Sequence, residues 1–377
     1  MDRYKVINGK IVLTDAILDH HALIVENNII IDITNDPDKY RDFEPIDATR
    51  QYISPGFVEM HIHGCGPYGF DTLGDPDLHG IAGFLRKKGI NTFVPTFQWD
   101  EKVVNEVAQR IKESGLLQKT IPGIYVEGPF INQEKKGGIS PDHIRRPDLD
   151  LLKQIIRDTQ GLLKLMTIAP EKEGARQLFD YLNANGIIPC FGHSNGEVND
   201  VFPTDQHQTN ITHLFNAMSG ISHKKSGLAM LPFIDRNVYF ELNGDGIHLN
   251  DETIKMCYNH LSKEKMILIS DAAVSAGLGY GEYTSYSKAI VSDQNGVRYK
   301  ENNLLMGSNL LVNDILKRFI ELTNAPLYEA VRFVSSNPCT LLGIEDQKGS
   351  IAIGKAADLI LLDEQYRVTR NISDPAV

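Results

Sequence analysis

Eight short apolar runs alternate with helix-like segments between residues 52 and 270, and this rhythm constrains the fold more than any other feature. The runs predicted to be strands are Tyr52–Ile62, Thr92–Thr96, Gly123–Glu127, Lys164–Ile168, Ile187–Gly192, Thr209–Leu214, Val238–Leu242 and Met266–Ser270. Between two of them, Asp100 followed by Val103, Val104, Val107 and Ile111 predicts an amphipathic helix with an Asp N-cap. Eight strands alternating with helices over roughly 290 residues predict a (β/α)8 TIM-like barrel.

An open, doubly wound parallel sheet is the alternative fold for such an α/β pattern. That fold commonly carries a glycine-rich phosphate loop after a strand. The sequence contains neither a GxGxxG segment after a predicted strand nor a GxxxxGK[ST] loop. The barrel is therefore the favoured prediction.

The two ends of the chain have a different sequence pattern, in which short β-like runs are separated by turn residues. These runs are Lys5–Ile7, Lys10–Leu13, Ala22–Val25, Ile29–Ile33, Ser350–Ile353 and Asp358–Leu362. We expect them to form one small discontinuous β-sandwich domain from residues 1–53 and 346–377. The catalytic barrel domain would then span residues 54–345.

Composition and charge narrow the class of partner. The chain is 42% hydrophobic and 23% charged, which is ordinary for a globular protein. Its formal net charge of −11 has the wrong sign for a general nucleic-acid binder, so a small-molecule partner is expected. The N-terminus is polar, and no run of ~18 apolar residues could cross a membrane.

Cysteine usage indicates the compartment. The four cysteines, Cys65, Cys190, Cys257 and Cys339, lie far apart and form no CxxC pair. This spacing favours neither a disulfide framework nor a thiolate zinc site, and it fits a reducing compartment. We expect a cytoplasmic protein without a membrane partner.

Polar residues gather at the ends of the predicted strands, where a (β/α)8 barrel places its chemistry. Five of the twelve histidines are among them. The residues at these ends are His61, His63, Glu127, His193, His213, Asp245, His248 and Asp271. Imidazoles and carboxylates converging on one face predict a divalent-metal site with open positions for water. The nitrogen and oxygen ligand set suits one or two ions of zinc or iron(II).

Taken singly, each of these residues has a structural alternative. His61 and His63 point the same way from a strand of period two, but alternating polar residues also mark a half-exposed strand. Glu127 could be a solvated rim residue, and His193 could be a hydrogen-bonded core histidine. Asp271 could cap the next helix. The metal hypothesis depends on all of them converging.

A longer series of motifs carries a resemblance to a known family. The motifs are Pro55-Gly56-Phe57-Val58-Glu59-Met60-His61-Ile62-His63-Gly64, Glu127-Gly128-Pro129-Phe130, Gly192-His193-Ser194, Thr212-His213-Leu214-Phe215-Asn216-Ala217-Met218, Asp245-Gly246-Ile247-His248, Ser270-Asp271-Ala272 and Gly349-Ser350-Ile351-Ala352-Ile353-Gly354-Lys355-Ala356-Ala357-Asp358-Leu359. In this order the chain resembles the amidohydrolase superfamily, and within it the deacetylases of N-acetyl amino sugar phosphates. That family has the same two-domain layout.

The resemblance implies a role for each matching residue. The implied metal ligands are Glu127, His193 and His213, with His61 and His63 as the pair for a second metal. The implied catalytic residue is Asp271, and the implied substrate contacts are Asn216, Ala217 and His248. The implied reaction removes acetate from N-acetylglucosamine-6-phosphate, giving glucosamine-6-phosphate, by a metal-activated water. The resemblance also implies a homodimer.

The sequence departs from the family pattern at two positions that concern the substrate. Ile139 stands where the family has a substrate-contacting histidine. Lys224 stands where the family has an arginine that reaches the substrate phosphate, often in the neighbouring subunit. Lysine can bind phosphate as a point charge but cannot make the two-pronged contact of arginine. N-acetylgalactosamine-6-phosphate or an unphosphorylated N-acetyl sugar therefore stays open as a substrate.

Two other functions compete with this one. A cyclic-amide hydrolase would have its two metals bridged by a carboxylated lysine at the end of the fourth strand. That strand ends at Ile168-Ala169, and Lys164 lies back near its start. A non-catalytic barrel would be expected to have lost ligands, and none is missing here.

Overall fold

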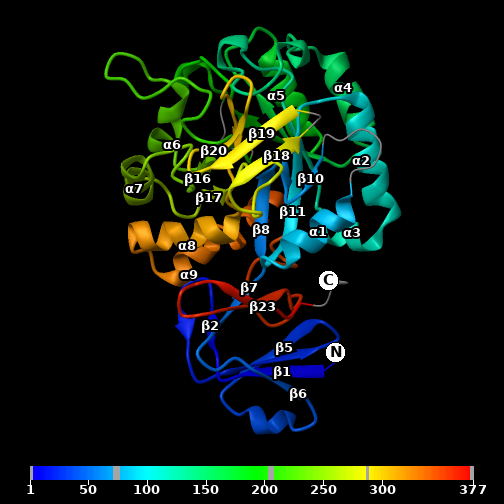
Figure 1. Cartoon of the computed structure of the whole chain (residues 1–377), viewed down its shortest axis with the longest axis vertical. Coiled ribbons are helices and arrows are strands. Elements are labelled where there is room, and N and C mark those ends of the chain that lie inside the picture. The colour runs from blue at the N-terminus through cyan, green and yellow to red at the C-terminus, as the bar shows by residue number, and fades with distance from the viewer. Residues whose placement is uncertain (1–2, 71–76, 203–207, 286–287, 374–377) are drawn as a thin grey trace.

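The computed structural model describes residues 3–70, 77–202, 208–285 and 288–373, and a parallel barrel lies at its centre (Figure 1). Its eight strands neighbour one another in chain order. They are β8 (Phe57–Ile62), β11 (Ile90–Phe97), β12 (Ile124–Glu127), β13 (Leu163–Ile168), β14 (Ile188–Phe191), β15 (Asn210–Ile211), β16 (Tyr239–Asn243) and β17 (Met266–Ile269). The last and first strands meet where the Asp271 amide donates to the His61 carbonyl at 3.0 Å. The predicted (β/α)8 barrel is confirmed.

Helices surround this barrel and cover its outer face (Figure 1). They are α1 (Leu78–Arg86), α2 (Glu101–Glu113), α3 (Gly115–Thr120), α4 (Leu149–Asp158), α5 (Ala175–Ala184), α6 (Leu231–Ile234), α7 (Asp251–His260), α8 (Val312–Thr323), α9 (Leu327–Arg332) and α10 (Ser336–Leu342). The predicted Asp100 cap is confirmed, because its carboxylate accepts from the Lys102 and Val103 amides at 3.0 and 3.2 Å. Short 3-10 turns are η1 (Pro37–Tyr40), η2 (Gln133–Lys135), η3 (Pro141–His143), η4 (Val198–Asp200) and η5 (Leu228–Met230).

The period of two along each barrel strand decides which side chains face the centre. On β12, Ile124 and Val126 pack in the same apolar cluster as helix residues such as Val107. Tyr125 belongs to a separate cluster inside the barrel, which includes Leu341 of α10. Glu127 follows Tyr125 by two positions, so its carboxylate also faces inward at the strand end.

The prediction of one continuous strand over Tyr52–Ile62 is wrong, because the chain turns at Gly56. Residues Tyr52–Pro55 form β7 in a different sheet, and the barrel strand β8 begins at Phe57. The Gly56 amide donates to the Asp358 carbonyl at 2.9 Å. A Cβ atom at Gly56 would lie 2.5 Å from side-chain atoms of both Asn91 and Asp358. Glycine therefore allows the close approach at which the two sheets separate.

The chain ends form two further sheets below the barrel (Figure 1). One has the order β5-β4-β1-β6 and the other has the order β23-β22-β7-β2-β3. These strands are β1 (Arg3–Ile7), β2 (Lys10–Val12), β3 (Ile17–Leu18), β4 (Ala22–Glu26), β5 (Ile29–Thr34), β6 (Glu44–Asp47), β22 (Leu359–Leu362) and β23 (Val368–Asn371). Leu361 of β22 pairs with Ile53 of β7, so both ends share a sheet as predicted. The exact division at residues 53 and 346 stays a prediction.

The predicted strand Ser350–Ile353 does not form. Its residues pair with no neighbouring strand, and the backbone hydrogen bonds to this part of the chain come slightly later. Ile30 donates to the Lys355 carbonyl at 2.9 Å and accepts from the Gly354 amide at 2.8 Å. Gly354 has φ +91°, a turn conformation that interrupts an extended ladder.

A four-stranded antiparallel sheet that the pattern analysis did not predict lies between β17 and α8. It consists of β18 (Gly281–Ser285), β19 (Lys288–Asp293), β20 (Gly296–Tyr299) and β21 (Leu305–Gly307), drawn mainly in yellow in Figure 1. Tyr299, Leu305 and Met306 of this sheet line the pocket at the barrel end. The dipeptide Asn295-Gly296, a strong hairpin signal, could have indicated it. A two-stranded ribbon of β9 (Gly64–Cys65) and β10 (Tyr68–Gly69) follows β8.

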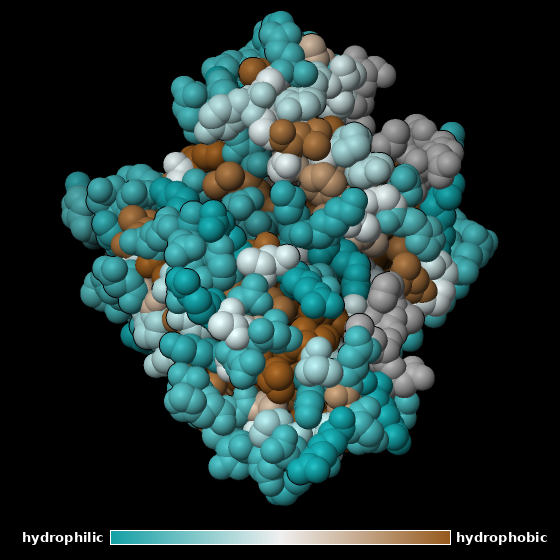
Figure 2. Space-filling model, turned by 60° about the horizontal axis from the view of Figure 1, so that its bottom comes forward, coloured by the Kyte–Doolittle hydropathy of each residue, from teal (hydrophilic) through white to brown (hydrophobic). Residues whose placement is uncertain are grey.

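The surface is largely polar on the face shown in Figure 2, where hydrophobic residues appear in separate patches. All four cysteines are buried and carry free thiols, in agreement with the prediction of no disulfide framework. Within the described parts of the chain, none of the helices has the length and apolar character needed to cross a membrane.

Candidate metal centre

The polar residues predicted from the strand ends meet in one pocket at the carboxyl end of the barrel. Glu127 is the last residue of β12, and His193, His213 and Asp271 each follow the end of their strand by two positions. The pocket is lined by His63, Gln98, Glu127, Gly137, Gly138, Ile139, His193, His213, Asn216, Ala217, His248, Asp271, Ala273, Val274, Tyr299, Leu304, Leu305 and Met306. Convergence, which the metal hypothesis required, is therefore present.

A first ligand group consists of Glu127, His193 and His213. Oε1 of Glu127 lies 2.9 Å from Nε2 of each histidine, and the two Nε2 atoms are 3.0 Å apart. Nδ1 of His193 lies 2.7 Å from the Lys135 carbonyl oxygen, which is a bond that an Nδ1–H would make. That bond leaves the Nε2 lone pair of His193 facing the carboxylate.

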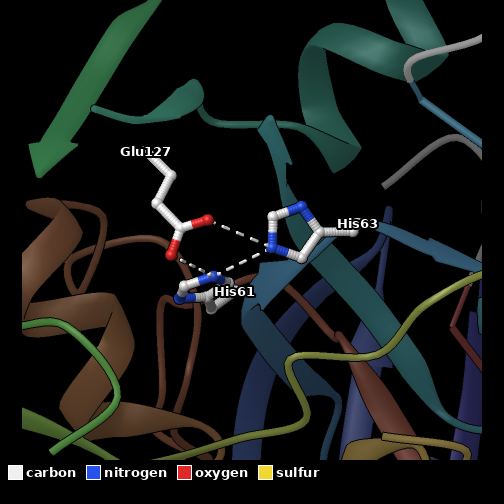
Figure 3. Close-up of side chains that lie close together, drawn as sticks. All are labelled: His61, His63 and Glu127. Atoms are coloured by element: carbon white, nitrogen blue, oxygen red, sulfur yellow. Dashed lines mark hydrogen bonds and ion pairs between the residues drawn. The ribbon is translucent and has the colours of Figure 1, made fainter. Parts of the chain in front are cut away.

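A second ligand group consists of His61, His63 and Glu127 (Figure 3). The two Nε2 atoms are 3.3 Å apart, and Oε2 of Glu127 lies 3.5 Å from Nε2 of His63. Nε2 of His61 lies 3.9 Å from Oε1 of Glu127. Glu127 belongs to both groups, so its carboxylate can serve as a bridge between two ions.

These donor sets fit a divalent ion. Ligands at 2.0–2.2 Å from a tetrahedral ion are separated by about 3.4 Å, close to the spacing in both groups. With no ion bound, burial alone would raise the pKa of Glu127, but the charge of a protonated His193 and hydrogen bonds from His193 and His213 hold that pKa well below its usual range. A bound cation would take the place of those protons and favour the ionised carboxylate in the same way. An ionised carboxylate between imidazole nitrogens is a typical site for zinc or iron(II).

Asp271 lies beside these groups, and its two carboxylate oxygens approach two different histidines. Its Oδ1 lies 3.3 Å from Nε2 of His63, and its Oδ2 lies 3.5 Å from Nε2 of His248. Nδ1 of His248 is in turn 2.7 Å from Oδ2 of Asp245. Burial would raise the pKa of Asp271, whereas the charges of His61, His63 and His248 lower it. Asp271 is therefore an ionised carboxylate, which is the form that a general base requires.

Three of the central residues share an unusual backbone conformation. His193, His213 and Asp271 have φ values of +45°, +30° and +50°. The left-handed region costs a non-glycine residue about 1–2 kcal/mol. Such strain persists only where surrounding contacts hold it, and it is frequent at functional sites.

The predicted substrate residues differ in where they lie. Asn216, Ala217 and His248 line the pocket, as does Ile139. Lys224 lies in an exposed loop and does not line the pocket. Among the residues that the structure describes, no lysine or arginine of the same chain lines this pocket.

The sequence pattern did not predict two polar residues of the site. Glu241 lies inside the apolar strand β16 and accepts hydrogen bonds from residues of both ligand groups. A charged residue inside an otherwise apolar strand was the available signal. Gln98 follows β11, lines the pocket and accepts from Nδ1 of His143 at 2.9 Å. No motif marked Gln98.

Comparison with known proteins places the chain in a family. The model of the amidohydrolase family matches residues 52–376, so the chain belongs to this family of metal-dependent hydrolases. The family match and the site together make the protein a hydrolytic enzyme.

Individual relatives cover nearly all of the chain. It is 28% identical over 359 residues to N-acetylgalactosamine-6-phosphate deacetylase from Escherichia coli O157:H7, covering 93% of each chain. It is 29% identical over 334 residues to N-acetylglucosamine-6-phosphate deacetylase from Bacillus subtilis, covering 85% of this chain and 83% of the relative. The crystal structure of N-acetylglucosamine-6-phosphate deacetylase from Thermotoga maritima superposes with a TM-score of 0.85 at 28% identity, covering 98% of both chains.

Proposed function

We propose that the enzyme hydrolyses the N-acetyl group of an amino sugar 6-phosphate, with N-acetylglucosamine-6-phosphate as its main substrate. The products are acetate and glucosamine-6-phosphate. The observation that carries this proposal is the pair of ligand groups sharing Glu127, with Asp271 3.3 Å from His63 at the same pocket. The names of the relatives from B. subtilis and T. maritima support the choice of sugar.

The residues of the centre divide the reaction between them. Glu127, His193 and His213 would hold one divalent ion, and His61 and His63 with Glu127 would hold a second. A zinc or iron(II) ion bound there would supply a water of lowered pKa and would polarise the amide carbonyl. Asp271 would take a proton from this water while the water oxygen attacks the carbonyl carbon of the amide. Asp271 then returns this proton to the nitrogen as the C–N bond breaks.

The remaining pocket residues would hold the sugar. His248 presents Nε2 to the pocket because Asp245 accepts from its other ring nitrogen at 2.7 Å. Asn216 and Ala217 line the same pocket and would contact the sugar or its phosphate.

The phosphate requires a positive charge that the described pocket of one chain lacks. We propose that Lys224 of a second copy supplies it in a homodimer. The exposure of Lys224 in its own chain supports this arrangement, because an exposed loop can reach a neighbour. We also propose that the enzyme acts in the cytoplasm, a proposal supported by its four free, buried thiols.

A substrate panel tests the proposed function. Acetate release is measured with N-acetylglucosamine-6-phosphate, N-acetylgalactosamine-6-phosphate and the two unphosphorylated sugars. We expect the highest kcat/KM for N-acetylglucosamine-6-phosphate. A higher value for the galactosamine epimer would favour the second candidate function, which the E. coli relative suggests. Equal values with and without phosphate would reject the phosphate site.

A further inference from the structure

Glu241 is a completely buried carboxylate at the centre of the barrel, and three donors surround it. Its Oε2 accepts from Nδ1 of His61 at 2.8 Å and from the backbone amide of His213 at 2.9 Å. Its Oε1 accepts from Nδ2 of Asn210 at 2.7 Å. Solvent does not reach either side chain of the bond between Glu241 and His61, because both residues are 0% exposed.

The bond to His61 decides which ring nitrogen can bind an ion. A proton on Nδ1, donated to Glu241, leaves the lone pair of His61 on Nε2. Nε2 is the atom that faces His63 at 3.3 Å in the second ligand group. A carboxylate behind a ligating histidine also makes the imidazole a stronger donor.

The bond to His213 extends the role of Glu241 to the first ligand group. His213 has φ +30°, so its backbone needs contacts that hold it in the left-handed region. The same Oε2 atom that accepts from His61 accepts the His213 amide. One carboxylate oxygen therefore connects a ligand of each group.

We propose that Glu241 is a positioning residue that sets the metal affinity of the second ligand group by orienting His61. This inference rests on the proposed function only in requiring that the centre binds a divalent ion. Glu241 touches neither the pocket nor the substrate. Its main effect on the reaction passes through His61, with a smaller one through the backbone of His213.

The test measures Zn²⁺ affinity by competition with a chelator, without using activity. Glu241→Gln keeps the shape and an acceptor oxygen but removes the charge behind His61. Loss of such a partner typically weakens metal binding by about 10- to 100-fold, and we expect a loss in this range for the weaker-bound ion. Circular dichroism of the metal-free protein should be unchanged.

Tyr125→Phe is the matched control inside the barrel. The Tyr125 hydroxyl is buried, bonds Thr212 and Thr167 at 2.8 and 3.2 Å, and makes no hydrogen bond to His61. The Tyr125 ring lies 5.0 Å from the His61 ring, a contact that Phe retains. This variant should bind Zn²⁺ within about twofold of the wild type, since no ligand loses a partner.

A double-mutant cycle distinguishes positioning from general disruption. In a His61→Ala background, Glu241→Gln should lower the remaining Zn²⁺ affinity far less than it does in the wild type, because only the weaker bond to the His213 amide is then changed. An equal loss with and without His61 would overturn the proposal, as would wild-type affinity in the single variant. Wild-type protein that binds no Zn²⁺ at all would contradict the proposed function as well.

Discussion

At the scale of single residues, position along the barrel strands made the convergence of the candidate metal ligands predictable. His193, His213 and Asp271 occur two residues beyond their strands, where the barrel geometry brings side chains together. Glu241 was not predicted, because it is a single acidic residue within an apolar strand. No second polar residue at a regular spacing marks it as part of a site. Its function depends on contacts with His61 and Asn210, which are far from it in the sequence.

Asp271→Asn tests whether this side chain carries the proton. The alternative that Asp271 caps the next helix is wrong, because residues 274–278 form a turn and no helix begins directly after Asp271. Asn keeps the size and shape of the side chain and removes its charge. Loss of a general acid and base should lower kcat by about 10²- to 10⁴-fold. Steady-state kinetics give kcat, and elemental analysis should show an unchanged metal content. A variant with wild-type kcat would show that another residue transfers the proton. His248 and His143 would then be the next residues to test.

Replacing His61 and His63 together with Ala tests the second ligand group. The change removes two of its three ligands, so metal content should fall by one ion per chain while the Glu127, His193 and His213 group keeps its own. The barrel should still form, but its unfolding free energy should fall, because His61 is completely buried and its loss removes a donor from the buried Glu241. Elemental analysis of protein purified without chelator is the measurement. Unchanged metal content would show that the pair does not bind an ion.

At the scale of elements, strong apolar periodicity predicted well and weak local signals did not. All eight barrel strands and the helix after Asp100 were predicted, since each lies in a segment rich in buried apolar residues. β15 contains only Asn210–Ile211 as a strand, although a run to Leu214 was expected. The sheet from β18 to β21 was missed because its exposed strands lack a long apolar pattern. The turn at Gly56 depends on its distant neighbours Asn91 and Asp358.

Gly56→Ala tests this turn between the two sheets. The added methyl group would overlap atoms of Asn91 and Asp358, so the variant should lose about 1–3 kcal/mol of unfolding free energy in urea. Gly83→Ala in α1 is the matched control, since no atom of the described residues outside its own helix backbone and chain neighbours lies within 4 Å of its Cβ position. That change should stabilise the protein by ~0.5–1 kcal/mol, because alanine favours helix. If both variants have wild-type stability, the close approach at Gly56 does not constrain the fold.

At the scale of the whole molecule, the pairing of both chain ends was predictable, but the phosphate site was not. β22 pairs with β7, although more than 300 residues separate them in the sequence. The short β-like runs at both ends of the chain indicated this pairing. The source of positive charge for the substrate depends on a second copy of the chain. A single sequence does not describe how two copies meet.

Lys224→Ala tests the proposed contribution from the second copy. A hydrogen bond to a charged group is worth ~1.5–3 kcal/mol, so the KM for N-acetylglucosamine-6-phosphate should rise by about 10-fold or more. The KM for the unphosphorylated sugar should not change. Lys225→Ala is the control, as an exposed neighbour in the same loop. Similar effects on both sugars would argue against a phosphate contact.

The most direct measurement of the central claim is acetate release by the purified enzyme before and after its metal is removed. Protein loaded with zinc or iron(II) should release one acetate for each N-acetylglucosamine-6-phosphate consumed. Chelation should abolish this activity, and adding the ion back should restore it. Full activity of verified metal-free protein would contradict the account, as would metal-loaded protein that releases no acetate from any of the four sugars.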